Sequence, residues 1–221
     1  MKEAGLLRKT ALIALIGFVF STFIGYLYRY IITKTGPEIY GSFTLALSVI
    51  SFALIFAKLG IDEGILRFLS LYSEEKNGKK AKKVFITSVY IVLFSSVIFA
   101  CGIYILSDFF AKIFHSSDTG YMLRILSFSL PFGALGLVFI ESLKAVKKAS
   151  ESIIIQQFIE RIFLITFTLI LFLFGFGIYG VLWIYVSAIF LTFFLSGLLL
   201  FKTIGFYKIK SKEFIKTSKL I

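Results

Sequence analysis

Residues 177–201 read GIYGVLWIYVSAIFLTFFLSGLLLF, a run without one charged side chain. About 20 consecutive apolar residues are enough for an α-helix to cross the hydrocarbon core of a bilayer. The run is continuously apolar and does not alternate with polar residues, which favours a membrane helix over a strand of a membrane β-barrel. This stretch therefore predicts an integral membrane protein built of helices.

Five further runs of the same kind precede this one. Together they predict six transmembrane helices, at about 10–33, 38–59, 84–107, 121–143, 152–174 and 177–201. The composition agrees, because the 221-residue chain is 58% hydrophobic and its mean hydropathy is +0.95, above the values of soluble domains. We expect an all-α membrane protein with one six-helix lobe over residues 1–204 and a basic cytoplasmic tail or linker over residues 205–221.

The basic residues indicate how the helices are oriented. Most of the 24 lysines and arginines lie in the N-terminus, the second and fourth connections and the tail, which all fall on one side of the membrane. The positive-inside rule places that side in the cytoplasm, so we expect both termini there. The net charge of +12 then serves topology, and we expect contact with membrane lipids of the cytoplasmic membrane and none with nucleic acid.

Sequence motifs of common enzyme classes are missing. The chain has no G-x-x-x-x-G-K-[ST] phosphate loop and no G-x-S-x-G nucleophile motif. His115 and Cys101 are the only histidine and the only cysteine, and the two lie far apart in the predicted topology. Such a pair cannot build a zinc site or a cysteine–histidine nucleophile. We therefore expect no enzyme activity, no metal and no cofactor, and we name no catalytic residue.

Charged side chains within the predicted helices are the candidate functional residues, because they are costly in lipid. Glu160 and Arg161 lie near the middle of the fifth helix, where neither reaches an interface easily. Two interpretations remain open for them, a role in a substrate cavity and a buried structural ion pair. Arginine suits an anionic substrate, since its planar fork binds phosphate oxygens with two hydrogen bonds.

A third candidate, Arg29, lies closer to the outer end of the first helix. From there a long side chain reaches water by extending outward, so a cavity role and a surface role fit equally well. Tyr26, Tyr28 and Tyr30 surround Arg29 in the sequence. They fit either an aromatic belt at the membrane interface, which we favour, or a surface for stacking sugars.

Three acidic residues are candidates for ion coupling. Asp62 and Glu63 follow the second helix, and Glu141 lies near the cytoplasmic end of the fourth. Solvated positions at a helix end explain all three as well as ion coupling does.

Proline at position 131 falls inside the fourth predicted helix. Because proline removes a backbone hydrogen bond, it predicts a kink. The kink is either the hinge of a moving transporter or a fixed feature of the helix.

The turn after the first helix carries a motif. It reads GPEIYG at residues 36–41, followed by LGI at 59–61 and RF at 67–68. This pattern resembles the polysaccharide-type (Wzx-like) flippases of the multidrug/oligosaccharidyl-lipid/polysaccharide (MOP) superfamily. The resemblance covers about residues 10–72 in motif and the whole chain in topology.

The resemblance implies a function. Such flippases move lipid-(pyro)phosphate-linked oligosaccharides across the cytoplasmic membrane for the synthesis of surface polysaccharides or other glycans, by alternating access through a cationic cavity, which Arg29 would face. They have two lobes of six or more helices, and this chain resembles the N-terminal lobe alone. A second lobe, either a C-terminal half or a second copy, is therefore an expected partner.

Two alternatives to the flippase remain. One is a multidrug or small-solute antiporter of the same superfamily, for which we expect an acidic cavity. The other is a non-transporting membrane protein, such as a scaffold in a glycan-assembly complex.

Overall fold

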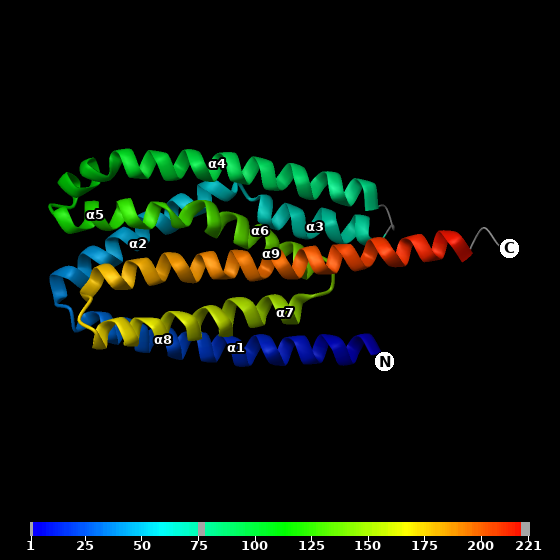
Figure 1. Ribbon diagram of the computed structural model, residues 1–221, viewed down its shortest axis with the longest axis horizontal. Helices are drawn as coiled ribbons and strands as arrows, with labels where there is room; N and C mark the ends of the chain where they lie inside the picture. The colour runs from blue at the N-terminus through cyan, green and yellow to red at the C-terminus, as the bar shows by residue number, and fades with distance from the viewer. Residues whose placement is uncertain (1, 75–77, 218–221) are drawn as a thin grey trace.

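The computed structural model describes residues 2–74 and 78–217, and every regular element over them is a helix (Figure 1). The elements are α1 (Lys2–Thr33), α2 (Pro37–Lys58), α3 (Ile61–Glu74), α4 (Gly78–Ile113), α5 (Ser117–Ser127), α6 (Ser129–Ala145), α7 (Ala149–Ile153), the π-helix η1 (Ile154–Ile159), α8 (Glu160–Leu173) and α9 (Gly177–Thr217).

Five rods are long and apolar enough to cross a bilayer alone: α1, α2, α4, the continuous α7–η1–α8 and α9. Helices α5 and α6 pass the same test together, although a bend of 47° separates them. Counted as one span, this pair brings the total over the described residues to six, which confirms the predicted number. Helix α1 begins and α9 ends at the same end of the molecule, which we call the terminal end (Figure 1).

The bend between α5 and α6 lies at Phe128, three residues before Pro131. Proline has no N–H to bond the carbonyl four residues earlier, that of Ser127, so the helix opens at this turn. The hydroxyls of Ser127 and Ser129 donate to the carbonyls of Arg124 and Leu126 at 2.7 and 2.6 Å. The predicted kink is confirmed, while movement at it stays a prediction.

Helix α3 is not among the six predicted helices. It buries Ile65 and Leu69, one turn apart, against Val138 and Leu143 of α6. It has only 14 residues and carries charges at Asp62, Glu63 and Arg67, so it is too short and too polar to be recognised as a membrane span. The sequence between the second and third predicted spans therefore folds as a helix of its own at the terminal end.

Several of the predicted spans are shorter than the helices that contain them. Helix α1 begins at Lys2, before the predicted start at 10, and α4 begins at Gly78, before the predicted start at 84. Helix α9 continues to Thr217, past the predicted end at 201. A hydropathy run measures the thickness of the hydrocarbon core, whereas a helix continues into water wherever its residues allow. No change in secondary structure marks the expected boundary between lobe and tail at residue 204, which stays a prediction.

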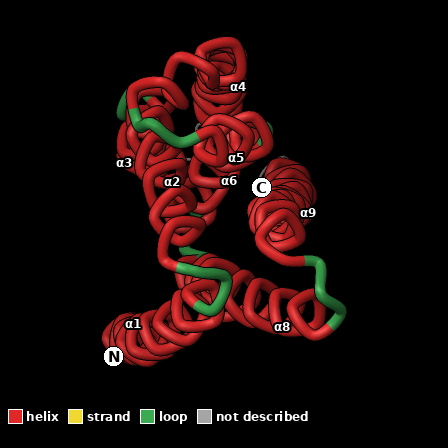
Figure 2. The backbone as a smooth tube through the Cα atoms, turned by 90° about the vertical axis from the view of Figure 1, so that its left-hand side faces the viewer, coloured by secondary structure: helices red, strands yellow, loops and turns green. Residues whose placement is uncertain are grey.

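The helices form two groups when the molecule is viewed along its long axis (Figure 2). Helices α2 to α6 lie together, and α9 packs beside α6. Helix α1 pairs with the α7–η1–α8 rod below them, and α9 connects the two groups by contacting both α6 and α8.

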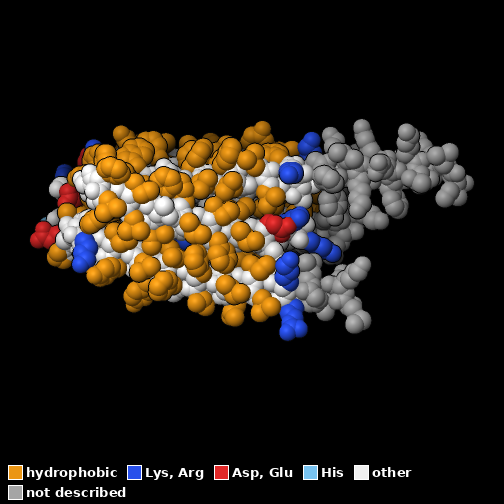
Figure 3. Space-filling view, turned by 60° about the horizontal axis from the view of Figure 1, so that its bottom comes forward, with side chains coloured by type: hydrophobic (Ala, Val, Ile, Leu, Met, Phe, Trp, Pro, Cys, Tyr) orange, Lys and Arg blue, Asp and Glu red, His pale blue; other side chains and the backbone are white. Residues whose placement is uncertain are grey.

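Hydrophobic and charged side chains occupy different parts of the surface along the same axis. Figure 3 shows a broad hydrophobic band, with most of the charged side chains gathered at the two ends. This distribution is what a bilayer-spanning protein requires, and it agrees with the six apolar spans.

Packing between α4 and α5 depends on Gly120. A Cβ at this position would lie 2.8 Å from Ala111 Cβ and 3.1 Å from the carbonyl oxygen of Ser107. Nearby, Arg124 of α5 donates to Asp108 at 2.6 Å and to Ser107 Oγ at 2.8 Å. Close contact at the glycine allows these polar groups to meet across the two helices.

We expect Gly120→Ala to destabilise the protein by about 1–3 kcal/mol, because the added methyl group overpacks the α4–α5 contact. The matched control is Gly102→Ala in α4, where a Cβ meets nothing within 4 Å. Thermal unfolding in detergent measures both. Equal melting temperatures for the two variants would show that the α4–α5 contact is not tight.

Candidate functional site

Glu160 and Arg161 lie in the middle of the α7–η1–α8 span, which runs from Ala149 to Leu173. At about 1.5 Å per residue, both are roughly 16–20 Å from either end of the span. Both are half-buried. The structure thus places them at the depth that the sequence predicts, where a charge needs protein partners.

Glu160 faces α9. Its Oε2 accepts a hydrogen bond of 2.9 Å from the hydroxyl of Thr192, a buried residue of that helix. The same hydroxyl lies 3.1 Å from the carbonyl oxygen of Ala188. The single O–H of Thr192 is therefore shared between the Glu160 carboxylate and a carbonyl of its own helix. This contact holds the carboxylate against α9.

Arg161 points to a different side of α8. Its Nε is buried and has no hydrogen-bond partner among the described residues. The guanidinium interacts electrostatically with Glu160 and with two tyrosines, Tyr28 of α1 and Tyr185 of α9. No ion pair within 4.0 Å neutralises Arg161 over the described part of the chain. The arrangement therefore differs from a closed Glu–Arg pair and leaves guanidinium donors available.

The turn before these residues is a π-helix, η1. It carries Gln157, whose Oε1 is buried without a partner and lies against Gly17 of α1. A side chain at position 17 would collide with this amide, so the glycine allows α1 to approach. Single π-turns are rare and occur often at functional sites. Sequence reasoning missed η1, since its residues are equally compatible with an α-helix.

Arg29 is not part of this cluster. Its side chain is exposed, and it makes no hydrogen bond or ion pair with any described residue. The preceding residue, Tyr28, is 7% exposed and enters the cluster instead, whereas Tyr26 and Tyr30 are 75% and 60% exposed. The expectation that all three tyrosines form an interfacial belt is wrong for Tyr28. A cavity role for Arg29 stays a prediction.

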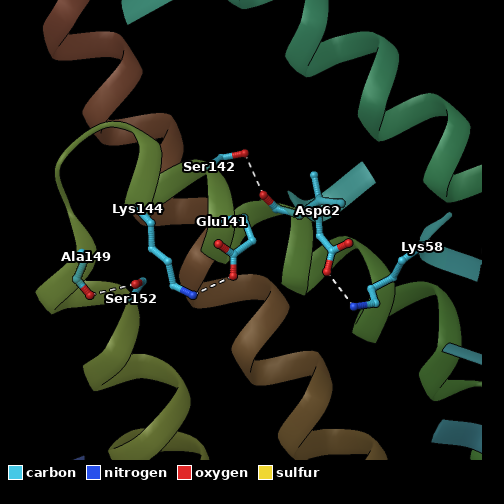
Figure 4. Close-up of polar contacts among 8 residues, drawn as sticks. Lys58, Asp62, Glu141, Ser142, Lys144, Ala149 and Ser152 are labelled. Atoms are coloured by element: carbon cyan, nitrogen blue, oxygen red, sulfur yellow. Dashed lines mark hydrogen bonds and ion pairs between the residues drawn. The ribbon is translucent and has the colours of Figure 1, made fainter. Parts of the chain in front are cut away.

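The acidic candidates for ion coupling lie on α3 and α6, outside the rod that carries Glu160 and Arg161. Asp62 pairs with Lys58 and Glu141 with Lys144, each at 2.6 Å (Figure 4), while Glu63 is exposed. Asp62 is only 9% exposed, so it is not the solvated group expected. Both paired carboxylates have cations within reach, and ion coupling by any of the three stays a prediction.

Over the described residues, no group of three or more His, Cys, Asp or Glu side chains is placed to hold a metal ion. The polar groups near the middle of the rod and on the helices beside it are instead one guanidinium, one carboxylate, the amides of Gln156 and Gln157, and several hydroxyls. Such a set binds by hydrogen bonds and charge, and suits an anionic or hydroxyl-rich ligand.

Comparison with known families decides the classification. The family described as "Polysaccharide biosynthesis protein" matches residues 6–220. The chain belongs to this family. The match confirms the resemblance stated from the GPEIYG turn and extends it over almost the whole sequence. No curated protein matches the chain.

One solved structure has the same fold as this chain. "Crystal structure of MATE in the bent conformation" aligns with a TM-score of 0.82 at 16% sequence identity, over 92% of this chain and 45% of that one. The identity is low, so the likeness is one of fold. The chain spans about half the length of that protein, which agrees with the expected single lobe.

We expect Thr192→Val to destabilise the protein by about 1.5–3 kcal/mol, because it removes a hydrogen bond to a half-buried carboxylate. Thr203→Val is the matched control, since the hydroxyl of Thr203 bonds only the carbonyl of Leu199 in the same helix, at 2.7 Å. Thermal unfolding in detergent compares them. If both variants lose the same stability, the bond to Glu160 contributes nothing.

Proposed function

We propose that this chain forms one half of a membrane transporter that moves a lipid-linked oligosaccharide, carried on a phosphate or pyrophosphate, across the cytoplasmic membrane. One observation carries the proposal. Arg161 is a half-buried arginine in the middle of its span, and its buried Nε has no partner among the described residues. A cation in this position costs several kcal/mol, about 2.5–3.5 on insertion scales, and such residues mark substrate paths.

The neighbouring contacts support an anionic ligand. Thr192 holds Glu160 against α9, so the carboxylate does not close onto the arginine. A phosphate oxygen approaching Arg161 meets a charged donor in a low-dielectric setting, where a charge-assisted hydrogen bond is strong. An organic cation would meet repulsion from the guanidinium, which favours the flippase over an antiporter of cationic drugs.

A second six-helix unit is the proposed partner. Only 6% of the residues in the α1 span are buried, against 39% in the α9 span. Helix α1 is therefore covered on one side by the α7–η1–α8 rod and apolar on its other sides, with Arg29 among the exposed residues. A second lobe, whether a further half or a second copy, would cover this face and enclose a cavity that alternates between the two sides of the membrane.

The direct test is translocation of a fluorescent lipid-pyrophosphate oligosaccharide in proteoliposomes. We expect Arg161→Ala to slow it at least tenfold, and Arg161→Lys to restore part of the rate, because lysine keeps the charge without the fork. Arg29→Ala reports whether the exposed arginine contributes as well.

Wild-type rates for both alanine variants would exclude a cationic cavity. Transport of small organic cations in place of the glycan would favour the antiporter. No transport of either, with a stable association with glycan-assembly enzymes, would favour the scaffold.

The proposed orientation is tested by labelling in intact cells. In a Cys101→Ser background, we expect a membrane-impermeant maleimide to label Lys34→Cys and not Lys9→Cys. Both positions are exposed and lie at opposite ends of α1. The reverse pattern would place the terminal end outside the cell.

A further inference from the structure

Four buried polar atoms without a hydrogen-bond partner lie on α1 and the rod beside it. They are Tyr28 Oη, Gln157 Oε1, Arg161 Nε and Thr168 Oγ1. Gln157, Arg161 and Thr168 are spaced by four and seven residues, which places them along one face of the rod. We call this line of atoms the α1–α8 seam.

Tyr28 and Thr168 lie at the same level of the seam. Thr10 and Ser150 share a hydrogen bond of 2.9 Å, and Gly17 contacts Gln157. Both contacts join residues 140 positions apart, and Figure 1 shows α1 and the rod running in the same direction. The same offset places Tyr28 and Thr168 at one level of the two helices, one or two turns outward of Arg161, where neither hydroxyl has a hydrogen-bond partner among the described residues.

The tyrosine hydroxyl also lies within electrostatic range of the arginine. Tyr28 and Tyr185 interact with each other and both interact with the Arg161 guanidinium. A phenol from α1 and a phenol from α9 thus both lie near the cation.

The hydroxyl of Tyr28 serves no packing purpose in the described protein. The ring is buried in the core and meets Phe43 edge-on, with ring centroids 6.4 Å apart. Phenylalanine would fill the same space without burying an unmade hydrogen bond, which is costly in a low-dielectric interior. Such a hydroxyl is therefore explained by a ligand that it meets in the working protein.

We propose that Tyr28 is a ligand-binding residue of this site, whose hydroxyl donates to the same phosphate group that Arg161 binds, with Thr168 at the outer end of the seam. The inference rests on the proposed function and deepens it. It assigns the contact from α1 to Tyr28, whereas the exposed Arg29 lies outside the seam.

The test uses the full chain in detergent and geranylgeranyl pyrophosphate as the probe, because this molecule carries a lipid pyrophosphate without sugar. We expect Tyr28→Phe to weaken binding about tenfold, as the loss of one hydrogen bond to a charged group does. The melting temperature without ligand should stay unchanged or rise, since no hydrogen bond within the protein is lost. Titration calorimetry and thermal unfolding measure the two effects.

Tyr26→Phe is the matched control, since it removes the same atom from an exposed position of the same helix. It should change neither quantity. Arg161→Ala, which should abolish binding, separates the inference from the proposed function.

Two results would overturn the inference. In the first, Tyr28→Phe would bind the probe as tightly as wild type while Arg161→Ala would not bind it. The phosphate site would then stand, and Tyr28 would not be part of it. Alternatively, Tyr28→Phe lowers the melting temperature of the ligand-free protein, which assigns the hydroxyl a structural role. If wild type itself fails to bind the probe, the proposed function falls together with the inference.

Discussion

Within a bilayer, every polar group must find its partner inside the protein, and this constraint organises the whole chain. The backbone meets it by forming helices almost everywhere. Serine and threonine hydroxyls meet it by bonding carbonyls of their own helix, as Ser142 does with Val138 and Ser196 with Thr192. Charged groups form pairs toward both ends of the bundle, such as Lys58 with Asp62 and Arg124 with Asp108. Of the five buried polar atoms without a partner over the described residues, four lie on α1 and on the rod that carries Arg161.

Hydropathy predicts the spans well because the bilayer imposes one length on all of them. It cannot predict α3, whose two buried apolar residues, Ile65 and Leu69, face α6 and not lipid. It also cannot predict how far α4 and α9 continue beyond the hydrocarbon. Pro131 predicts a bend, but the bend angle depends on how α5 and α6 pack against α2 and α9.

The candidate site, like the fold, is only partly predictable from the sequence. Depth alone identifies Glu160 and Arg161, because depth follows from position in an apolar run. The choice between Tyr28 and Arg29 depends on which face of α1 meets the rod, and α1 is apolar on all sides, so its sequence carries no signal for that face. The contact of Gly17 with Gln157 sets the face, and only the folded structure reveals it.

The π-helix η1 determines which of the two neighbouring charged side chains, Glu160 or Arg161, points toward the α1–α8 seam. A π-turn holds one residue more than an α-turn, so everything after it is rotated by about 100° relative to an uninterrupted α-helix. Arg161 thereby takes the direction in which a regular helix would place Glu160. Two opposite charges stand next to each other in the sequence, and the winding of one turn decides which of them bonds α9 and which lies near Tyr28 of α1.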